Sequence, residues 1–194
     1  MSVSEWIALG ILFLTLTPGA SRRQSGRSFS SRSLGLIFAA SVIAIFGAAF
    51  FSSYFLYENW TKGALTQFFL PPHQGWGYFY STAGYKFFAP WLISLLAAIV
   101  LGRLGEVLNR RWGERFFETE EIWIMRLSFF LVGYPGLWFY TIFLLFVGAG
   151  LSAAYGVLAK GRAPLYYLWL PLAIATILIQ GWVIPFQILN FFKL

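Results

Sequence analysis

The chain has 194 residues, of which 59% are hydrophobic and 11% charged, and its formal net charge is +7. A soluble domain has ~25% charged residues, so this chain has too few to cover a water-soluble globule, and it is too hydrophobic to be disordered. It contains no cysteine, no aspartate and one histidine, His73. These absences exclude disulfides, thiolate metal sites and paired-histidine ligation, so we expect no metal and no cofactor.

Apolar segments predict an all-α polytopic membrane protein that forms a single transmembrane domain over residues 1–194. A helix that crosses the ~30 Å hydrocarbon core needs about 20 mainly apolar residues. The apolar blocks that reach or approach this length are, in chain order, Trp6–Thr17, Leu34–Leu56, Phe87–Leu101, Ile122–Leu158 and Pro164–Gln180.

The block at 122–158 is too long for one crossing and is interrupted by Gly133-Tyr134-Pro135-Gly136. Glycine and proline both interrupt helices, so we expect a helical hairpin made of Ile122–Val132 and Leu137–Leu158. The tail 182–194 contains Pro185 and is either a further half-helix or an interfacial segment. The chain is thus expected to cross the membrane about six times.

Basic residues alternate with the expected crossings. Three alternate loops and their helix ends carry eleven of the fourteen lysines and arginines, at positions 22–32, 103–126 and 160–162. Positive residues concentrate in cytoplasmic loops, so we expect a multi-pass protein of the cell (inner) membrane whose N-terminus lies outside. This loop bias also explains the net charge without a nucleic-acid partner; the expected partners are membrane lipids and other membrane proteins.

Residues 57–85 are expected to form a long outer loop rich in aromatic residues, glycine and proline. One interpretation is a lid or ligand platform in which Trp76 and Tyr78 stack against a substrate. The alternative is an interfacial segment, because tryptophan and tyrosine concentrate at headgroup depth. His73 lies in this loop without a neighbouring acid or serine and is expected to face solvent or lipid.

A charged cytoplasmic segment is expected at 102–121. Glu106 and Arg110 have the i,i+4 spacing of a helical ion pair, so the third helix should continue past the membrane. Glu120 and Glu121 would begin the next helix, where the helix dipole favours acids, with Thr119 as a cap. The alternative is an intramembrane catalytic or cation site with Glu121 and Arg126 as its central pair.

In that alternative Glu120 is a further catalytic candidate. Arg22 and Arg23 are binding candidates that would converge with these residues on one cytoplasmic pocket. A charge that enters the hydrocarbon region is costly and therefore points to a function.

The order of the segments carries a resemblance to a known family. A first helix ends in the basic stretch Thr17-Pro18-Gly19-Ala20-Ser21-Arg22-Arg23, a hairpin opens at Glu121-Ile122-Trp123, and the basic link Lys160-Gly161-Arg162 precedes the last helix. In this order the chain resembles the membrane domain of the type IV prepilin peptidases, which are intramembrane aspartyl peptidases. The resemblance implies a shared helix arrangement.

The family cleaves with two aspartates, one after the first helix and one in a Gly-x-Gly-Asp motif that opens the hairpin. Here the first region offers no acid, and only Glu121 or Glu120 could replace the second aspartate. An aspartyl mechanism needs two carboxylates that share a proton. We therefore expect a divergent, non-catalytic scaffold or assembly partner. The alternatives are a membrane protein that binds or transports a small molecule or lipid, and a glutamate-dependent membrane peptidase.

Overall fold

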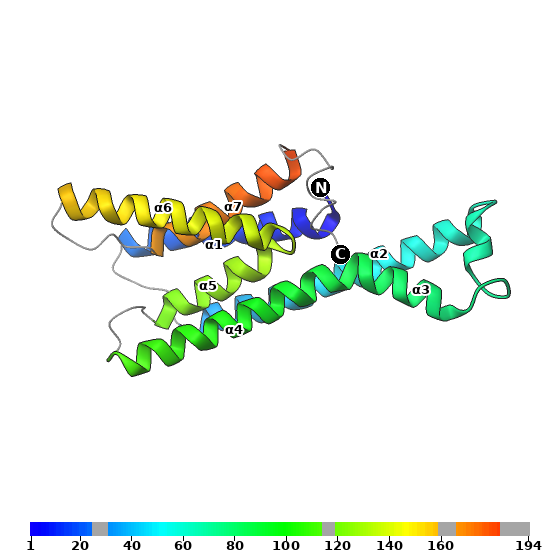
Figure 1. Ribbon diagram of the computed structural model, residues 1–194, viewed down its shortest axis with the longest axis horizontal. Coiled ribbons are helices and arrows are strands. Elements are labelled where there is room, and N and C mark those ends of the chain that lie inside the picture. Colours follow the sequence, from blue (N-terminus) through cyan, green and yellow to red (C-terminus); the bar gives the residue numbers. More distant parts are fainter. Residues whose placement is uncertain (25–30, 114–118, 159–165, 183–194) are drawn as a thin grey trace.

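In the computed structural model, residues 1–24, 31–113, 119–158 and 166–182 are described, and every regular element in these ranges is a helix (Figure 1). The expectation of an all-α fold is therefore confirmed for this part of the chain. The elements, in order, are α1 (Val3–Gln24), α2 (Ser31–Lys62), the 3₁₀ turn η1 (Thr66–Phe69), α3 (Trp76–Ala83), the π-helical turn η2 (Gly84–Phe88), α4 (Ala89–Arg111), α5 (Thr119–Val132), α6 (Gly136–Leu158) and α7 (Tyr166–Trp182).

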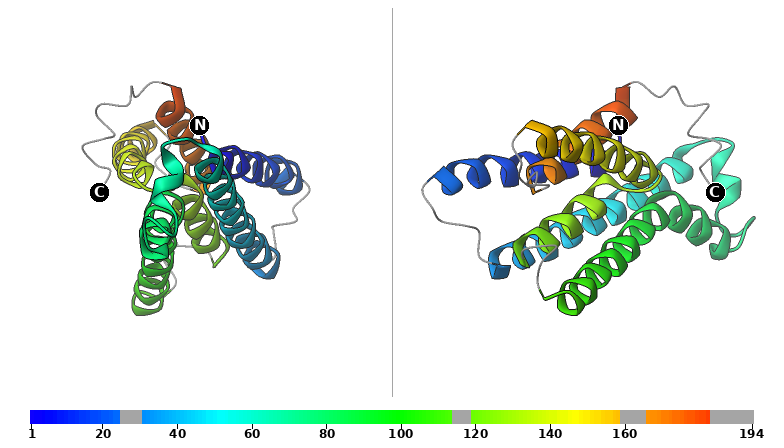
Figure 2. Two further views of the ribbon diagram at one scale, coloured as in Figure 1. Left: turned by 90° about the vertical axis from the view of Figure 1, so that its right-hand side faces the viewer. Right: turned by 60° about the vertical axis from the view of Figure 1, so that its left-hand side comes forward.

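Helix α5 is the centre of the bundle. It contacts α1, α2, α4, α6 and α7, as the views in Figures 1 and 2 illustrate. Eleven of its fourteen residues are buried. A helix that is apolar on all sides needs an apolar environment all round, and here the neighbouring helices provide it. In the run Ile122–Val132 only Arg126 and Ser128 are polar. The packing of the bundle thus places three polar residues of α5 in its interior, Glu121, Arg126 and Ser128.

The predicted hairpin at 122–158 is present as α5 and α6. Gly133 turns the chain in the left-handed region, with φ of 71°, a conformation that glycine adopts without a steric penalty. A Cβ at Gly133 would lie only 3.1 Å from Trp91 of α4. The amide of Leu137 donates to the carbonyl of Gly133 over 2.8 Å and starts the new helix. The turn therefore needs a glycine for two separate reasons.

The expected outer loop at 57–85 is mostly helical, which corrects the sequence-based prediction. Helix α2 continues to Lys62, α3 begins at Trp76, and η2 joins α3 to α4 in one continuous helical run. The two arms form a helical hairpin, which projects beyond the other helices in Figure 1. Its own small core consists of Leu70, Phe79 and Ala83. Aromatic rings that recur at helical spacing on both arms pack against each other, and this packing stabilises helices where a loop was expected.

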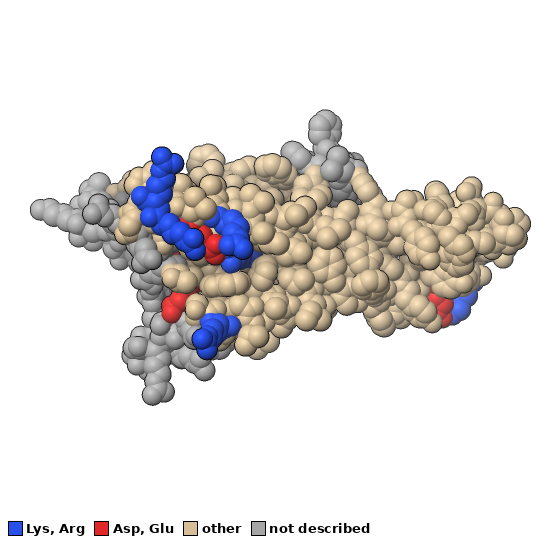
Figure 3. Space-filling model, turned by 90° about the horizontal axis from the view of Figure 1, so that it is seen from below, with Lys and Arg blue, Asp and Glu red and all other residues tan. Residues whose placement is uncertain are grey.

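Apolar side chains cover the outside of the two longest helical runs. Ser31–Lys62 and Trp76–Arg111 are long and apolar enough to cross a membrane, and only 28% and 22% of their most apolar 18-residue windows are buried. Three shorter apolar helices lie at Val3–Leu16, Gly136–Leu151 and Leu168–Gly181. On the face seen in Figure 3, charged side chains gather towards the two ends, and the surface between them is uncharged.

The positions of the helix ends explain where these charges lie. The N-terminal ends of α2 and α5 and the C-terminal end of α4 lie at the same end of the bundle (Figure 1). As the sequence predicts, α4 continues past its apolar part to Arg111 and carries Arg103, Glu106 and Arg110. Residues 183–194, and Pro164 before α7, lie outside the described residues, so the question of a further half-helix is not addressed by the structure.

Candidate functional site

The buried charges of α5 are the most unusual polar feature of the described structure. Glu121 and Arg126 are each only 8% exposed. Glu121 lies in the first turn of α5, as the sequence predicts, and Arg126 lies in the middle of the helix. A buried charge is costly unless it is paired and hydrogen-bonded, so the partners of these two side chains define what the site can do.

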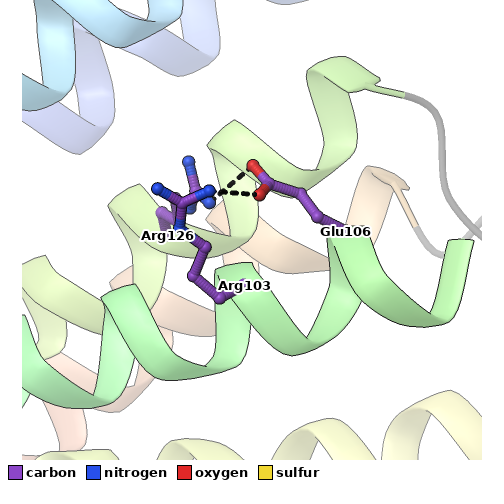
Figure 4. A network of polar contacts seen from close by, with 3 residues as sticks. All are labelled: Arg103, Glu106 and Arg126. Atoms are coloured by element: carbon purple, nitrogen blue, oxygen red, sulfur yellow. Dashed lines mark hydrogen bonds and ion pairs between the residues drawn. The ribbon is translucent and has the colours of Figure 1, made fainter. Parts of the chain in front are cut away.

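Arg126 pairs with an acid from another helix. Its Nη2 donates to Oε1 of Glu106 on α4 over 2.7 Å, and Arg103 Nη1 approaches the other carboxylate oxygen, Oε2, at 3.2 Å (Figure 4). One carboxylate thus lies between two guanidinium groups. The Arg126 side chain is 10% exposed, whereas that of Arg103 is 74% exposed. The pair of Arg126 and Glu106 is therefore the buried part of the network and Arg103 its solvent-facing edge.

Two predicted pairings differ from these contacts. Glu106 was expected to pair with Arg110, but in the structure it pairs with Arg103 and Arg126. The alternative of an intramembrane site had Glu121 and Arg126 as its central pair, whereas in the structure the ion pair of Arg126 is with Glu106. Residues five apart on a helix point about 140° away from each other at 100° per residue. Glu121 and Arg126 therefore reach different neighbouring helices.

The absence of a side chain at Gly102 makes room for Arg126 where α4 and α5 approach closely. A Cβ on Gly102 would overlap Nε of Arg126 and would lie 2.6 Å from its Cγ. The guanidinium carbon lies 4.7 Å from the centre of the Trp123 ring, a cation–π distance. Nε itself is buried without a hydrogen-bond partner. The arginine is thus held by one acid, one aromatic ring and the backbone at Gly102.

Glu121 is held on the opposite side of α5, against α7. The indole Nε1 of Trp169 donates to Glu121 Oε1 over 3.2 Å. The backbone carbonyl of Trp169 accepts a 3.1 Å hydrogen bond from the Tyr140 hydroxyl of α6. Tyr140 is fully buried, so this chain of contacts ties α5, α6 and α7 together. Glu121 also has a further interaction.

The remaining charged candidates are Glu120 on α5 and two arginines on α1. Glu120 is next to Glu121 in the first turn of α5 and is partly exposed. Arg22 and Arg23 lie in the last turn of α1, and the positions of their side chains lie outside the described part. Within the described residues, no group of three or more His, Cys, Asp or Glu side chains could hold a metal ion.

Trp76 and Tyr78 lie on α3 in the projecting hairpin, far along the chain from the buried charges. Both are about half exposed. Trp76 stacks on Tyr57 with ring centres 6.0 Å apart, and Tyr78 stacks on Trp60 at the same distance. The two residues therefore face different parts of α2. Trp76 lines an aromatic cleft of about 430 Å³ between α2 and the α3–η2–α4 run, which Tyr78 does not line.

Sequence reasoning missed three contributors to these sites. Glu106 was assigned a local partner, Trp169 was not considered, and Gly102 was not singled out. One signal was available for Glu106. A buried arginine is costly unless it is paired, and Glu106 is the nearest acid before Arg126 that lies outside α5 and the loop that precedes it. The roles of Gly102 and Trp169 depend on helix packing.

Comparison of the chain with models of protein families, with curated protein sequences and with solved structures found no match. The functional conclusion therefore depends on the residues and contacts described above.

Proposed function

We propose that the chain is a polytopic integral membrane protein of the cell membrane that acts without catalysis, as a scaffold or assembly partner for other membrane components. We also propose that its helices follow the order found in the membrane domain of the type IV prepilin peptidases. Its expected partners are bilayer lipids and the helices of other membrane proteins.

The single observation that carries the proposal is the exposure of apolar side chains along the two longest helical runs. The most apolar windows of the two longest helical runs are only 28% and 22% buried, whereas the core helix of a soluble protein is mostly buried. Ile43 and Phe50 of α2 are 74% and 68% exposed, while Glu121 and Arg126 are buried. Such exposed apolar surface is stable when lipid, rather than water, surrounds it.

Helix length and charge support an orientation. Helix α2 has 32 residues, about 48 Å at ~1.5 Å per residue, which exceeds the ~40–45 Å of a bilayer with its headgroups. Arg103, Arg110 and Arg111 lie at the end of the bundle where α4 finishes. The positive-inside rule assigns this end to the cytoplasm. The hairpin tip and the N-terminus would then lie outside.

The contacts of the carboxylates support a non-catalytic role. Glu121 accepts from Trp169, and Glu106 is occupied by two arginines. Two carboxylates that activate water must share a site, and these two are bound to different helices. The sequence also lacks every aspartate of the usual peptidase mechanism. The charged cluster is best explained as the element that joins α4 to α5.

An unpartnered surface on α6 supports a role in assembly. The outward-facing residues Ala149, Gly150, Ala153 and Ala154 are small and exposed, and a Cβ on Gly150 would meet no atom within 4 Å. Small residues at i,i+4 spacing let membrane helices approach closely. This face is therefore suited to contact with a helix of another protein.

A second candidate function is the binding of a lipid or small molecule, favoured by the aromatic cleft beside Trp76. It does not exclude a role in assembly, because the cleft and the outward face of α6 lie on different helices.

Alkaline carbonate extraction followed by affinity purification of the tagged full chain tests the proposal. We expect the chain to stay in the membrane pellet and to co-purify with a membrane protein, and Gly150→Leu to weaken that association. Glu121→Gln and Glu120→Gln should not alter it. Release by carbonate would contradict the membrane assignment. Cleavage of a prepilin by the purified protein that is lost in Glu121→Gln would contradict the non-catalytic assignment.

A further inference from the structure

The cleft between α2 and the α3–η2–α4 run has the dimensions of a ligand site. Its volume is about 430 Å³, within the ~300–1,000 Å³ typical of small-molecule pockets. The ten described residues that line it include no charged side chain. The lining therefore offers no partner to an ion, which favours an uncharged ligand.

Aromatic rings form both walls of the cleft. At one end Phe50 and Phe88 meet edge to face, with ring centres 4.9 Å apart. At the other end Tyr57 and Trp76 stack at 6.0 Å, with 24° between their planes. Tyr57 follows Phe50 by seven residues, about 10 Å along α2. The cleft is therefore long enough for a ring together with the first part of an apolar tail.

The two ends of the cleft differ in chemistry. Phe50 and Phe88 offer only rings, whereas Tyr54, Tyr57 and Trp76 carry hydroxyl or indole N–H groups that can donate hydrogen bonds. A molecule that matches this gradient has an apolar part near the phenylalanines and a polar, hydrogen-bond-accepting part near the tyrosines. Stacked aromatic walls favour a planar ring in the polar part.

The cleft opens onto the apolar surface of the molecule. Phe50 and Tyr54, which line it, are 68% and 62% exposed. On the proposed membrane assignment this surface faces lipid, and Tyr54 lies about 35 Å along α2 from Ser31, near the level of the outer headgroups. A ligand would therefore enter sideways from the outer leaflet.

We propose that the cleft binds an uncharged, ring-bearing amphipathic lipid of the quinone type. The planar ring lies at the Tyr57–Trp76 end, where its carbonyl oxygens accept hydrogen bonds, and the apolar tail leaves past Phe50 and Phe88 towards the membrane interior. This inference rests on the proposed membrane location, because it is the lipid phase that supplies the ligand.

Gly84 provides a precise way to fill the cleft. It lines the cleft, and a Cβ on it would meet no atom within 4 Å, so a side chain at this position starts in open space beside the cleft. Gly77 of α3 is equally unobstructed but does not line the cleft. Gly84→Leu and Gly77→Leu are therefore a matched pair of variants on one helical arm.

The test is equilibrium binding of a radiolabelled decyl-benzoquinone to the purified full chain in detergent micelles, with an uncharged saturated monoacylglycerol as the ringless comparison. We expect saturable binding of the quinone, a loss of affinity of about tenfold or more in Gly84→Leu, and no comparable loss in Gly77→Leu. Tyr57→Phe keeps the ring and removes a hydrogen-bond donor, so it should weaken binding of the quinone but not of the monoacylglycerol. It provides a second variant if Gly84→Leu does not fold.

Equal affinity in the unsubstituted chain and a folded Gly84→Leu variant would overturn the inference. So would non-saturable partitioning of the quinone into micelles, or Gly84-dependent binding of the monoacylglycerol in preference to the quinone. Carbonate extraction of the same variants separates a failure of the ligand assignment from a failure of the membrane location. A chain that stays in the membrane pellet but binds no quinone contradicts only the ligand assignment, whereas a chain released by carbonate contradicts the membrane location itself.

Discussion

Gly102 of α4 lies directly against the side chain of Arg126 of α5, so closely that a Cβ on the glycine would overlap the arginine Nε. This contact places the guanidinium beside Glu106 and Trp123. It links a residue without a side chain to the most deeply buried ion pair among the described residues.

Gly102→Ala is expected to force Arg126 out of its position and to destabilise the fold by about 1–3 kcal/mol, the usual cost of overpacking. Thermal or denaturant unfolding in detergent micelles measures the change. Gly47→Ala on α2 is the control, because a Cβ there meets no atom within 4 Å, and alanine should be neutral or stabilising. Equal stability of both variants would show that Arg126 does not depend on this contact.

Glu106→Gln should destabilise the protein by about 2 kcal/mol, because it leaves the buried guanidinium of Arg126 without its acid. Arg126→Met combined with Glu106→Gln should recover much of that loss, since the uncompensated charge is then absent. A double-mutant cycle of unfolding free energies measures the coupling. Additive effects of the two substitutions would mean that the pair contributes no interaction energy.

Glu121→Gln is expected to keep the fold and any cellular phenotype, because the amide oxygen still accepts from Trp169. Glu121→Ala should cost about 1–3 kcal/mol, since the indole N–H loses its acceptor. Unfolding in micelles and complementation of a deletion strain are the measurements. Loss of phenotype in a stably folded Glu121→Gln variant would indicate that the carboxylate has a chemical role.

Gly133→Ala should destabilise the turn between α5 and α6 by about 1 kcal/mol or more, because alanine strains a backbone with positive φ. The 3.1 Å approach of Trp91 adds to this cost. Trp91→Leu combined with Gly133→Ala should relieve the steric part and leave the backbone part. Unfolding of both single variants and of the double variant separates these contributions, and an unchanged stability of Gly133→Ala would contradict both.

Apolar block length and helix-interrupting residues were sufficient to predict the helices, the hairpin at 122–158 and the charged extension of α4. The same composition misled at 57–85, where glycine, proline and aromatic residues suggested a loop. The rings of Trp60, Phe79 and Trp76 instead pack between two helical arms. Composition records how many aromatic residues are present, whereas the helical hairpin depends on which faces they occupy on both arms.

The polar cluster was predictable only in part. The sequence identified Glu121 and Arg126 as exceptional because an apolar stretch surrounds them. It could not assign their partners, because Glu106 and Trp169 come from other helices and the choice depends on how closely those helices approach α5. Gly102 determines that approach on one side, and glycine in an apolar helix has no unique interpretation from sequence.

The central claim is that lipid surrounds the exposed apolar faces, and the absence of cysteine from the chain allows a direct test. Single cysteines at Arg110, Ile43 and Gln67 sample the charged end, the middle of α2 and the hairpin tip. All three residues are exposed in the described structure. In sealed inverted membrane vesicles, we predict that a membrane-impermeant maleimide labels the cysteine at 110, labels that at 67 only after permeabilisation, and leaves that at 43 unlabelled. Rapid labelling at position 43 in intact vesicles would contradict the account.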